Sequence, residues 1–267
     1  MRCKVYIRLV VVVLAFCSVF FGVGYASRNP LDEQEVWDLV YISDSTGFGV
    51  AAKYADNIEK DTGKTVQVKN YALGGLSALR VLNALQAEPG DLANYPFQSI
   101  RKDFSEAEVI VFFANPRGDP SRGGVVGGME HCIRADQPPD DCAPELYEPY
   151  VENLKAIYEE ILNLRNGKPT VIRAVDFYNP LISLHREKNM EAECTRCFET
   201  FNAAVREAAE AFNIPLVSVY DAFNGTDHNE EPREKGYIGS DGVHASDKGQ
   251  QVIADLLSKV GYKPIGP

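Results

Sequence analysis

WDLVYISDSTGFG, residues 37–49, is the stretch that decides the fold of this chain. Leu39–Ile42 is a short apolar run of β-branched and aromatic residues, which is typical of a buried strand. Val50–Lys60 then carries apolar residues at helical spacing, and the small polar residues Ser43–Ser45 stand between the two segments. In an open parallel sheet, such a turn lies at the carboxyl end of a strand, where ligands bind.

Ser45 is the residue of this turn that we expect to be exposed near the amino end of a helix, where a serine can act as a nucleophile. The alternative is that Asp44 and Ser45 only cap the helix, since both residue types are favoured at that position. The remainder of the chain has to distinguish these two interpretations.

The size and charge of the chain restrict its class. Its 267 residues, 45% of them hydrophobic, predict one globular domain with a sizeable core, or at most two domains. The formal net charge of -11 argues against nucleic acid as a partner, because phosphate binding requires clustered Lys and Arg. The same charge disfavours electrostatic docking to anionic lipid.

The amino-terminal segment has the pattern of a signal peptide. Basic residues precede the apolar run Leu9–Val23, and small residues follow it up to Ala26. We therefore predict a signal peptide over 1–26, a mature domain over 27–267, and a secreted or periplasmic protein with no membrane span after cleavage. The apolar run is shorter than the ~20 residues of a spanning helix, and an uncleaved membrane anchor is the alternative.

Four cysteines remain after residue 26, namely Cys132, Cys142, Cys194 and Cys197. An even number in an exported protein indicates two disulfides, for which three connectivities exist. The local pairs Cys132–Cys142 and Cys194–Cys197 are the simplest, and we predict them. A zinc site that also uses histidine is an alternative, but the spacing does not match a known finger pattern.

Apolar runs and helical periodicity alternate along the mature chain. They predict strands at Leu39–Ile42, Thr65–Lys69, Val109–Phe113, Thr170–Val175 and Leu216–Tyr220, with helices at Val50–Lys60, Leu76–Leu85, Tyr150–Leu164, Ala192–Phe212 and Lys248–Val260. Arg117–Pro149 has no periodicity and is rich in Pro and Gly, so we predict a long loop. This alternation is typical of an α/β protein with a mostly parallel sheet of five strands.

A second chemical signal is Asp241-Gly242-Val243-His244, directly before the last predicted helix. A general-base imidazole needs a carboxylate on one ring nitrogen so that the other nitrogen can accept a proton. Asp and His three residues apart can supply this pair within one loop. The other three histidines have no aspartate in such a position beside a predicted strand end. The alternative is a turn in which the aspartate caps the helix.

Together these segments resemble the SGNH hydrolases, the GDSL-type lipase and esterase family. Ser43-Asp44-Ser45 resembles the Gly-Asp-Ser block, and Asn70 with Gly75 resembles the second block. Asn115 resembles the asparagine of the third block, and Asp241–His244 resembles the Asp-x-x-His block. The chain departs from the family at Ser43, which replaces glycine, and around Asn115, where Ala and Pro flank the asparagine.

The resemblance implies a three-layer α/β/α, flavodoxin-like fold and a carboxylic ester hydrolase without a metal or cofactor. It implies Ser45 as nucleophile, His244 as base and Asp241 as the residue that orients His244. The oxyanion donors would be the N–H groups of Ser45 and Gly75 and the side-chain amide of Asn115. Gly74 competes with Gly75 for this role.

The substrate we expect is a short acyl ester, acetyl-like, of a carbohydrate or another small alcohol. The residues after the catalytic positions are small or polar, such as Thr46, Gly47 and Ser77, whereas a lipase needs a wide apolar surface. The loop Arg117–Pro149 is also mostly polar, although it can equally pack away from the site. A carbohydrate O-acyltransferase with the same triad and a non-catalytic secreted binding protein remain alternatives.

Overall fold

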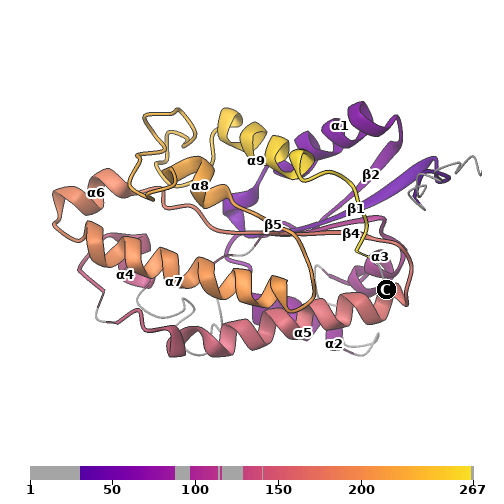
Figure 1. Ribbon diagram of the computed structural model, residues 1–267, viewed down its shortest axis with the longest axis horizontal. Helices are drawn as coiled ribbons and strands as arrows, with labels where there is room; N and C mark the ends of the chain where they lie inside the picture. Colours follow the sequence, from indigo (N-terminus) through magenta and orange to yellow (C-terminus); the bar gives the residue numbers. More distant parts are fainter. Residues whose placement is uncertain (1–30, 88–96, 114, 116–128, 140, 266–267) are drawn as a thin grey trace, which may run out of the picture.

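The computed structural model describes residues 31–87, 97–113, 115, 129–139 and 141–265 (Figure 1). The strands are β1 (Val36–Ile42), β2 (Thr65–Asn70), β3 (Val109–Phe113), β4 (Val171–Val175) and β5 (Leu216–Val217). The helices are η1 (Ser45–Gly47), α1 (Val50–Thr62), α2 (Ala78–Gln86), α3 (Ile100–Glu106), α4 (Met129–Arg134), η4 (Pro144–Tyr147), α5 (Glu148–Arg165), α6 (Ile182–Glu187), α7 (Glu191–Glu210), α8 (Val219–Asn224) and α9 (Asp247–Lys259).

The strands form one parallel sheet in the order β2-β1-β3-β4-β5, which confirms the predicted three-layer, flavodoxin-like α/β fold. The chain moves outward from β1 to β2, then crosses back and continues through β3, β4 and β5. Because crossovers between parallel strands are right-handed, this reversal sends helices to opposite faces of the sheet. Helices α1 and α9 accordingly cover one face, and α2, α3, α5 and α7 cover the other (Figure 1).

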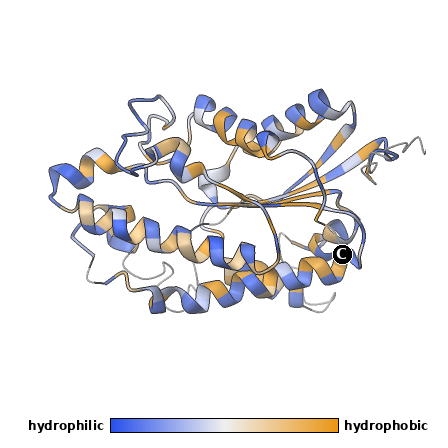
Figure 2. Cartoon of the chain, viewed as in Figure 1, coloured by the Kyte–Doolittle hydropathy of each residue, from blue (hydrophilic) through white to orange (hydrophobic). Residues whose placement is uncertain are grey.

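Figure 2 shows hydrophobic residues concentrated in the strands of the sheet and in stripes along the helices. Every residue of β3 and β4 is buried, as expected for central strands covered on both faces. In α1, Val50, Tyr54 and Ile58 are spaced four apart and are fully buried against the sheet. The carboxyl ends of the strands are thereby held in a rigid core.

The predicted strand Leu216–Tyr220 is wrong beyond Val217, because α8 begins at Val219. Ser218 caps this helix by accepting a hydrogen bond from the backbone N–H of Asp221 at 3.2 Å. The buried carboxylate of Asp176, after β4, accepts further hydrogen bonds from the N–H groups of Val219 and Tyr220. These contacts satisfy the free donors of a helix start, which overrides the strand preference of Val219 and Tyr220.

The prediction that Arg117–Pro149 is a loop is wrong for part of that segment. Helix α4, η4 and the first residues of α5 lie within it. Residues 117–128 and 140 lie outside the described residues. Helix α4 is only six residues long, and a helix of that length gives little periodicity in a sequence.

The predicted disulfide pairs are also wrong, since Cys132 bonds to Cys194 and Cys142 bonds to Cys197. Cys194 and Cys197 are three apart in α7, so both side chains lie on the helix face that packs against α4 and the chain after it. Each cysteine therefore pairs across to that segment rather than with its neighbour. All four sulfurs are used in this way, and the zinc alternative does not match the structure.

The predicted signal peptide lies outside the described residues, so its cleavage stays a prediction. Within the part of the chain that the structure describes, no helix has the length and apolar character to cross a membrane.

Candidate active site

Three neighbouring strands end at the same edge of the sheet and carry the candidate residues there. Ser45 follows β1, Gly75 follows β2 and Asn115 follows β3, and β1 lies between the other two strands. The backbone of Ser43 accepts a hydrogen bond from the N–H of Leu73 at 3.1 Å, which joins the segments after β1 and β2. The topology thus gathers residues that are up to 70 positions apart in sequence.

The turn after β1 is held by its own buried groups. Asp44 is 5% exposed and accepts a hydrogen bond from the Thr46 N–H at 2.9 Å, so it caps η1. A Cβ atom on Gly47 would lie 2.6 Å from the Ser43 side chain and from the Tyr41 hydroxyl, so only glycine fits. Asp44 therefore plays the helix-capping role that the alternative interpretation of this turn predicted. Ser45 is different, because its hydroxyl reaches a histidine.

The Ser45 Oγ lies 2.9 Å from His244 Nε2, although the two residues are 199 positions apart. The other ring nitrogen, His244 Nδ1, lies 2.8 Å from Asp241 Oδ2. Asp241 Oδ1 accepts hydrogen bonds from the N–H groups of Val243 and His244 at 2.9 and 3.0 Å. These backbone donors, followed by the imidazole, lower the pKa of Asp241 to about 2. The aspartate is therefore ionised at neutral pH and faces the imidazole as a carboxylate.

Asp241 and His244 lie on a small hairpin that precedes α9. Ile238 and Ala245 form an antiparallel bridge, and the Gly239 N–H donates to the His244 carbonyl at 2.8 Å. From outside the hairpin, Arg233 donates to the Gly242 carbonyl at 2.8 Å. Gln250 of α9 donates to the Ala245 carbonyl at 3.0 Å. Arg233 and Gln250 were not predicted from the sequence, where their nearness to the Asp-x-x-His segment is the only signal for them.

A contact between histidine and aspartate is not sufficient to identify the site. His131 Nδ1 lies 2.9 Å from Asp136, and His228 Nε2 lies 2.9 Å from Asp221. Their second ring nitrogens face the side chains of Gln137 and Glu199, respectively. His185 is buried and its Nε2 lies 2.7 Å from the Cys132 carbonyl oxygen. His244 is the histidine that joins a carboxylate to a serine hydroxyl.

Gly75 and Asn115 differ in their exposure. Gly75 is exposed and has a φ of 69°, a left-handed conformation that glycine adopts without strain. Asn115 is 4% exposed, and its carbonyl accepts a hydrogen bond from Tyr150 Oη at 2.6 Å. Both residues follow strands adjacent to β1, and their roles as oxyanion donors stay a prediction.

Thr46, Gly47 and Ser77, which we expected to form small polar surroundings of the site, are buried. Ser77 instead caps α2 by accepting a hydrogen bond from the Arg80 N–H at 3.2 Å. These residues support the segments from within and do not form the surface that a substrate would meet. Residues 117–121, which we also expected to provide polar surroundings, lie outside the described residues.

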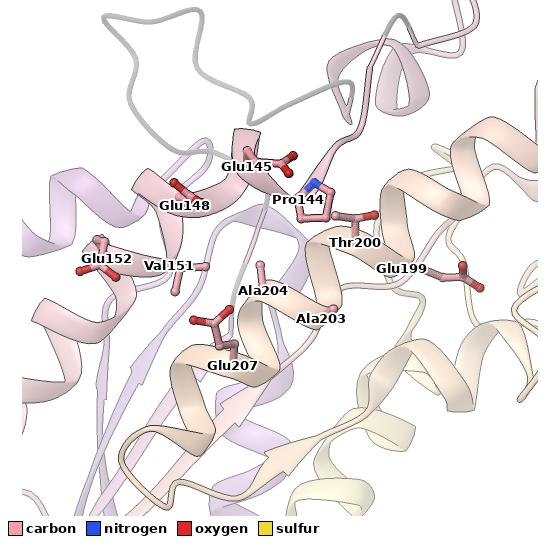
Figure 3. A pocket seen from close by; sticks show the side chains of 10 residues that line it. All are labelled: Pro144, Glu145, Glu148, Val151, Glu152, Glu199, Thr200, Ala203, Ala204 and Glu207. Carbon is pink, nitrogen blue, oxygen red and sulfur yellow. The ribbon is translucent and has the colours of Figure 1, made fainter.

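A separate hollow of about 500 Å³ lies between α7 and the segment formed by η4 and the start of α5 (Figure 3). Its polar lining is mainly glutamates, contributed by both sides: Glu145, Glu148, Glu152, Glu199 and Glu207. Lys155 forms ion pairs with two of these glutamates, at 3.3 and 3.0 Å. The hollow contains none of the candidate catalytic residues.

Comparison with known proteins agrees with this geometry. The family model for GDSL-like lipase/acylhydrolase matches residues 128–257, a range that includes Asp241 and His244. The chain is 23% identical to the spore germination lipase LipC of Bacillus licheniformis over 216 residues, which cover 80% of this chain and 87% of LipC. By these matches the chain is similar to the GDSL-like lipase/acylhydrolase family, the SGNH hydrolases, which are carboxylic ester hydrolases.

Solved structures share the fold. A lipase from a goat rumen metagenome, Lip_vut3, superimposes with a TM-score of 0.58 at 19% sequence identity. The matched region covers 86% of this chain and 99% of the Lip_vut3 chain. The acetyl xylan esterase Axe2 of Geobacillus stearothermophilus gives a TM-score of 0.50 at 16% identity, with coverages of 86% and 97%. At these identities the likeness concerns the fold alone.

Proposed function

We propose that the protein is a serine esterase in which Ser45, His244 and Asp241 act as the catalytic triad. One observation carries this proposal: the Ser45 hydroxyl contacts His244 Nε2 at 2.9 Å while His244 Nδ1 contacts Asp241 at 2.8 Å. Acyl transfer needs a nucleophile, a base and a group that orients the base, within hydrogen-bond reach of each other. The described residues of the turn and the hairpin supply all three groups.

In the proposed mechanism, Ser45 Oγ attacks the ester carbonyl and His244 Nε2 takes the hydroxyl proton. The N–H groups of Ser45 and Gly75 and the side-chain amide of Asn115 stabilise the oxyanion, and loss of one such donor typically costs ~10²–10³ in rate. His244 then returns the proton to the leaving alcohol, and an acyl-Ser45 ester remains. Water, activated by the same histidine, hydrolyses this ester and restores the enzyme.

Asp241 stabilises the imidazolium that forms while His244 holds the proton. Because the pKa of Asp241 is lowered to about 2, its carboxylate keeps its charge across the pH range in which a histidine changes its own. The pH dependence of the reaction above about pH 4 is therefore expected to come from groups other than Asp241.

We further infer that the substrate is a short acyl ester, acetyl-like, of a carbohydrate or a small alcohol. Within the described residues of the catalytic turn, Ser43–Gly49, one large apolar side chain is strongly exposed, namely Phe48 at 45%. Elsewhere in the part of the chain that the structure describes, the strongly exposed large apolar residues lie outside the segments that carry the triad: Val36, Val68, Leu146 and Val260. A single exposed ring suits a short acyl group better than a long chain, which needs continuous apolar contact.

Two assays test this proposal. Ser45→Ala should abolish hydrolysis of p-nitrophenyl acetate, whereas Ser77→Ala, in a buried helix cap, should retain it. Activity that persists in Ser45→Ala would refute the triad. A series of p-nitrophenyl esters from acetate to palmitate should then show the highest kcat/KM at short chains. A maximum at about eight carbons or more would refute the short-acyl substrate, since each buried methylene contributes ~0.8 kcal/mol.

The signal peptide is part of the proposal and rests on sequence alone. Secretion with cleavage after Ala26 should give a mature protein that begins at Ser27. Amino-terminal sequencing of the exported protein tests this. A mature chain that still starts at Met1 would favour the uncleaved anchor.

A further inference from the structure

Three of the four segments that carry the proposed catalytic groups have a backbone carbonyl that accepts a hydrogen bond from a buried tyrosine, and the segment of Gly75 is the fourth. Tyr41 donates to the Gly47 carbonyl at 3.1 Å, two residues after Ser45. Tyr150 donates to the carbonyl of Asn115 itself at 2.6 Å. Tyr178 donates to the Val243 carbonyl at 3.0 Å, one residue before His244. One tyrosine thus contacts the nucleophile turn, one the Asn115 segment and one the hairpin.

We propose that Tyr41, Tyr150 and Tyr178 are positioning residues that fix these three segments relative to one another. This inference rests on the proposed function, because it assigns the tyrosines a role through Ser45, Asn115 and His244. None of the three hydroxyls is assigned contact with a substrate. Their effect is on the geometry in which the reacting groups meet.

The three tyrosines are suited to this role because they belong to the rigid core. Each is at most 1% exposed. Tyr41 lies within β1, and Tyr150 lies in α5 with its ring 5.2 Å from that of Phe201. Tyr178 follows β4, and its ring centroid lies 4.6 Å from that of Phe223. A hydroxyl held at the end of a packed ring has little freedom, so the carbonyl that it contacts is held at a fixed point.

The hydroxyls also remain donors throughout the working pH range. Burial raises the pKa of all three tyrosines above the ordinary value. Ionisation would turn each donor into an acceptor and break the contact with the carbonyl oxygen. The raised pKa keeps the proton in place at neutral and moderately alkaline pH.

Burial alone does not explain these contacts. Among the described residues, four other buried tyrosine hydroxyls have no hydrogen-bond partner: Tyr54, Tyr147, Tyr158 and Tyr220. Tyr158 lies on α5, two turns after Tyr150, and is also fully buried. Tyr71 is also buried and paired, but its hydroxyl donates to Asp103 on α3. Burial therefore does not by itself give a tyrosine hydroxyl a partner, and the contacts of Tyr41, Tyr150 and Tyr178 share the feature that each ends on a catalytic segment.

Removal of one of these hydroxyls would leave a carbonyl without its partner and allow its segment to move. A misplacement of about 1 Å can cost ~10²-fold in rate. We expect the phenylalanine variants to lose about tenfold or more in kcat, because the segment shifts while the ring still fills its place. KM should change less, since no substrate contact is removed.

The experiment compares Tyr41→Phe, Tyr150→Phe and Tyr178→Phe with Tyr158→Phe as the matched control. Active sites are titrated with a fluorophosphonate, and kcat is expressed per titrated site at 25 °C, well below the melting temperature of each variant. The proposal predicts a kcat per site reduced about tenfold or more in the three variants and within twofold of wild type in Tyr158→Phe. Near-ultraviolet circular dichroism identifies the variants that retain native packing. Only the kcat values of those variants are used to test the proposal.

The outcomes separate this inference from the proposed function. If the wild-type protein neither hydrolyses esters nor reacts with the probe, the proposed function fails. If wild type is active and the three variants match Tyr158→Phe, the positioning role fails alone. A fall in the number of titrated sites with an unchanged kcat per site would mean a purely structural role and would overturn the inference. Failure of all three variants to fold would overturn it in the same way.

Discussion

Asp241→Asn isolates the carboxylate of the proposed triad with little change in shape. The asparagine Oδ1 can still accept the hydrogen bonds that Asp241 Oδ1 takes from the N–H groups of Val243 and His244. The other contact is reversed, because the amide NH₂ now points a donor at His244 Nδ1, 2.8 Å away in the native protein. The proton of the neutral imidazole is then favoured on Nε2, the nitrogen that faces Ser45 and has to accept a proton.

The size of the effect follows from the exposure of the pair. The side chains of His244 and Asp241 are 42% and 54% exposed, so water screens their interaction. An ion pair about 4 Å apart is worth about 1 kcal/mol in water and about 4 kcal/mol near a protein surface. The lost stabilisation of the imidazolium in the transition state therefore predicts a fall in kcat/KM between about fivefold and about 10³-fold. KM should change little.

The assay is hydrolysis of p-nitrophenyl acetate together with the rate of fluorophosphonate labelling. Both depend on proton removal from Ser45, so both should fall by a similar factor. Asp247→Asn is the control, because Asp247 lies six residues further on, is 91% exposed and pairs with Lys53 rather than with His244. A loss of less than threefold in Asp241→Asn, or an equal loss in Asp247→Asn, would refute the assigned role of the carboxylate.

Three further predictions concern the framework of the site. Gly249→Ala should lower the free energy of unfolding by about 1–3 kcal/mol, because its Cβ would lie 2.1 Å from the Tyr237 carbonyl oxygen. Urea unfolding tests this, with Gly74→Ala as the control, because a Cβ at Gly74 would have no atom within 4 Å. Burial raises the pKa of Asp176 to about 6 from an unfolded value near 3.8, so the folded state favours the protonated acid and loses stability as pH rises from about 4 to 6. Asp176→Asn should remove this pH dependence of the unfolding free energy, and parallel slopes for the two proteins would contradict the assignment. Non-reducing peptide mapping should find both disulfides between α7 and the chain from α4 to η4, and a Cys-Thr-Arg-Cys peptide with an internal disulfide would contradict the fold.

The sheet and the proposed triad could be predicted because their signals are local. Val109–Phe113 is a fully apolar run, and it forms a strand with those bounds. Asp241 and His244 are three residues apart, so one turn brings their side chains together whatever the remainder of the chain does. The order of the four sequence blocks then indicated which serine meets this pair.

The parts that were wrong or missed depend on contacts between distant segments. Val219 and Tyr220 have strand-forming side chains, but Asp176, more than 40 positions earlier, holds their N–H groups at a helix start. The disulfide partners depend on how α7 faces the segment around α4, which spacing alone does not encode. Tyr150 and Tyr158 are both buried residues of α5. Nothing in the sequence indicates that the hydroxyl of Tyr150 has a hydrogen-bond partner whereas that of Tyr158 has none.

The measurement that tests the central claim most directly is the identification of the residue that a fluorophosphonate modifies. The labelled wild-type protein is digested, and the modified peptide is sequenced by mass spectrometry. The proposed triad predicts a single adduct on Ser45. An adduct on any other serine, or the absence of an adduct in a protein that hydrolyses esters, would contradict it.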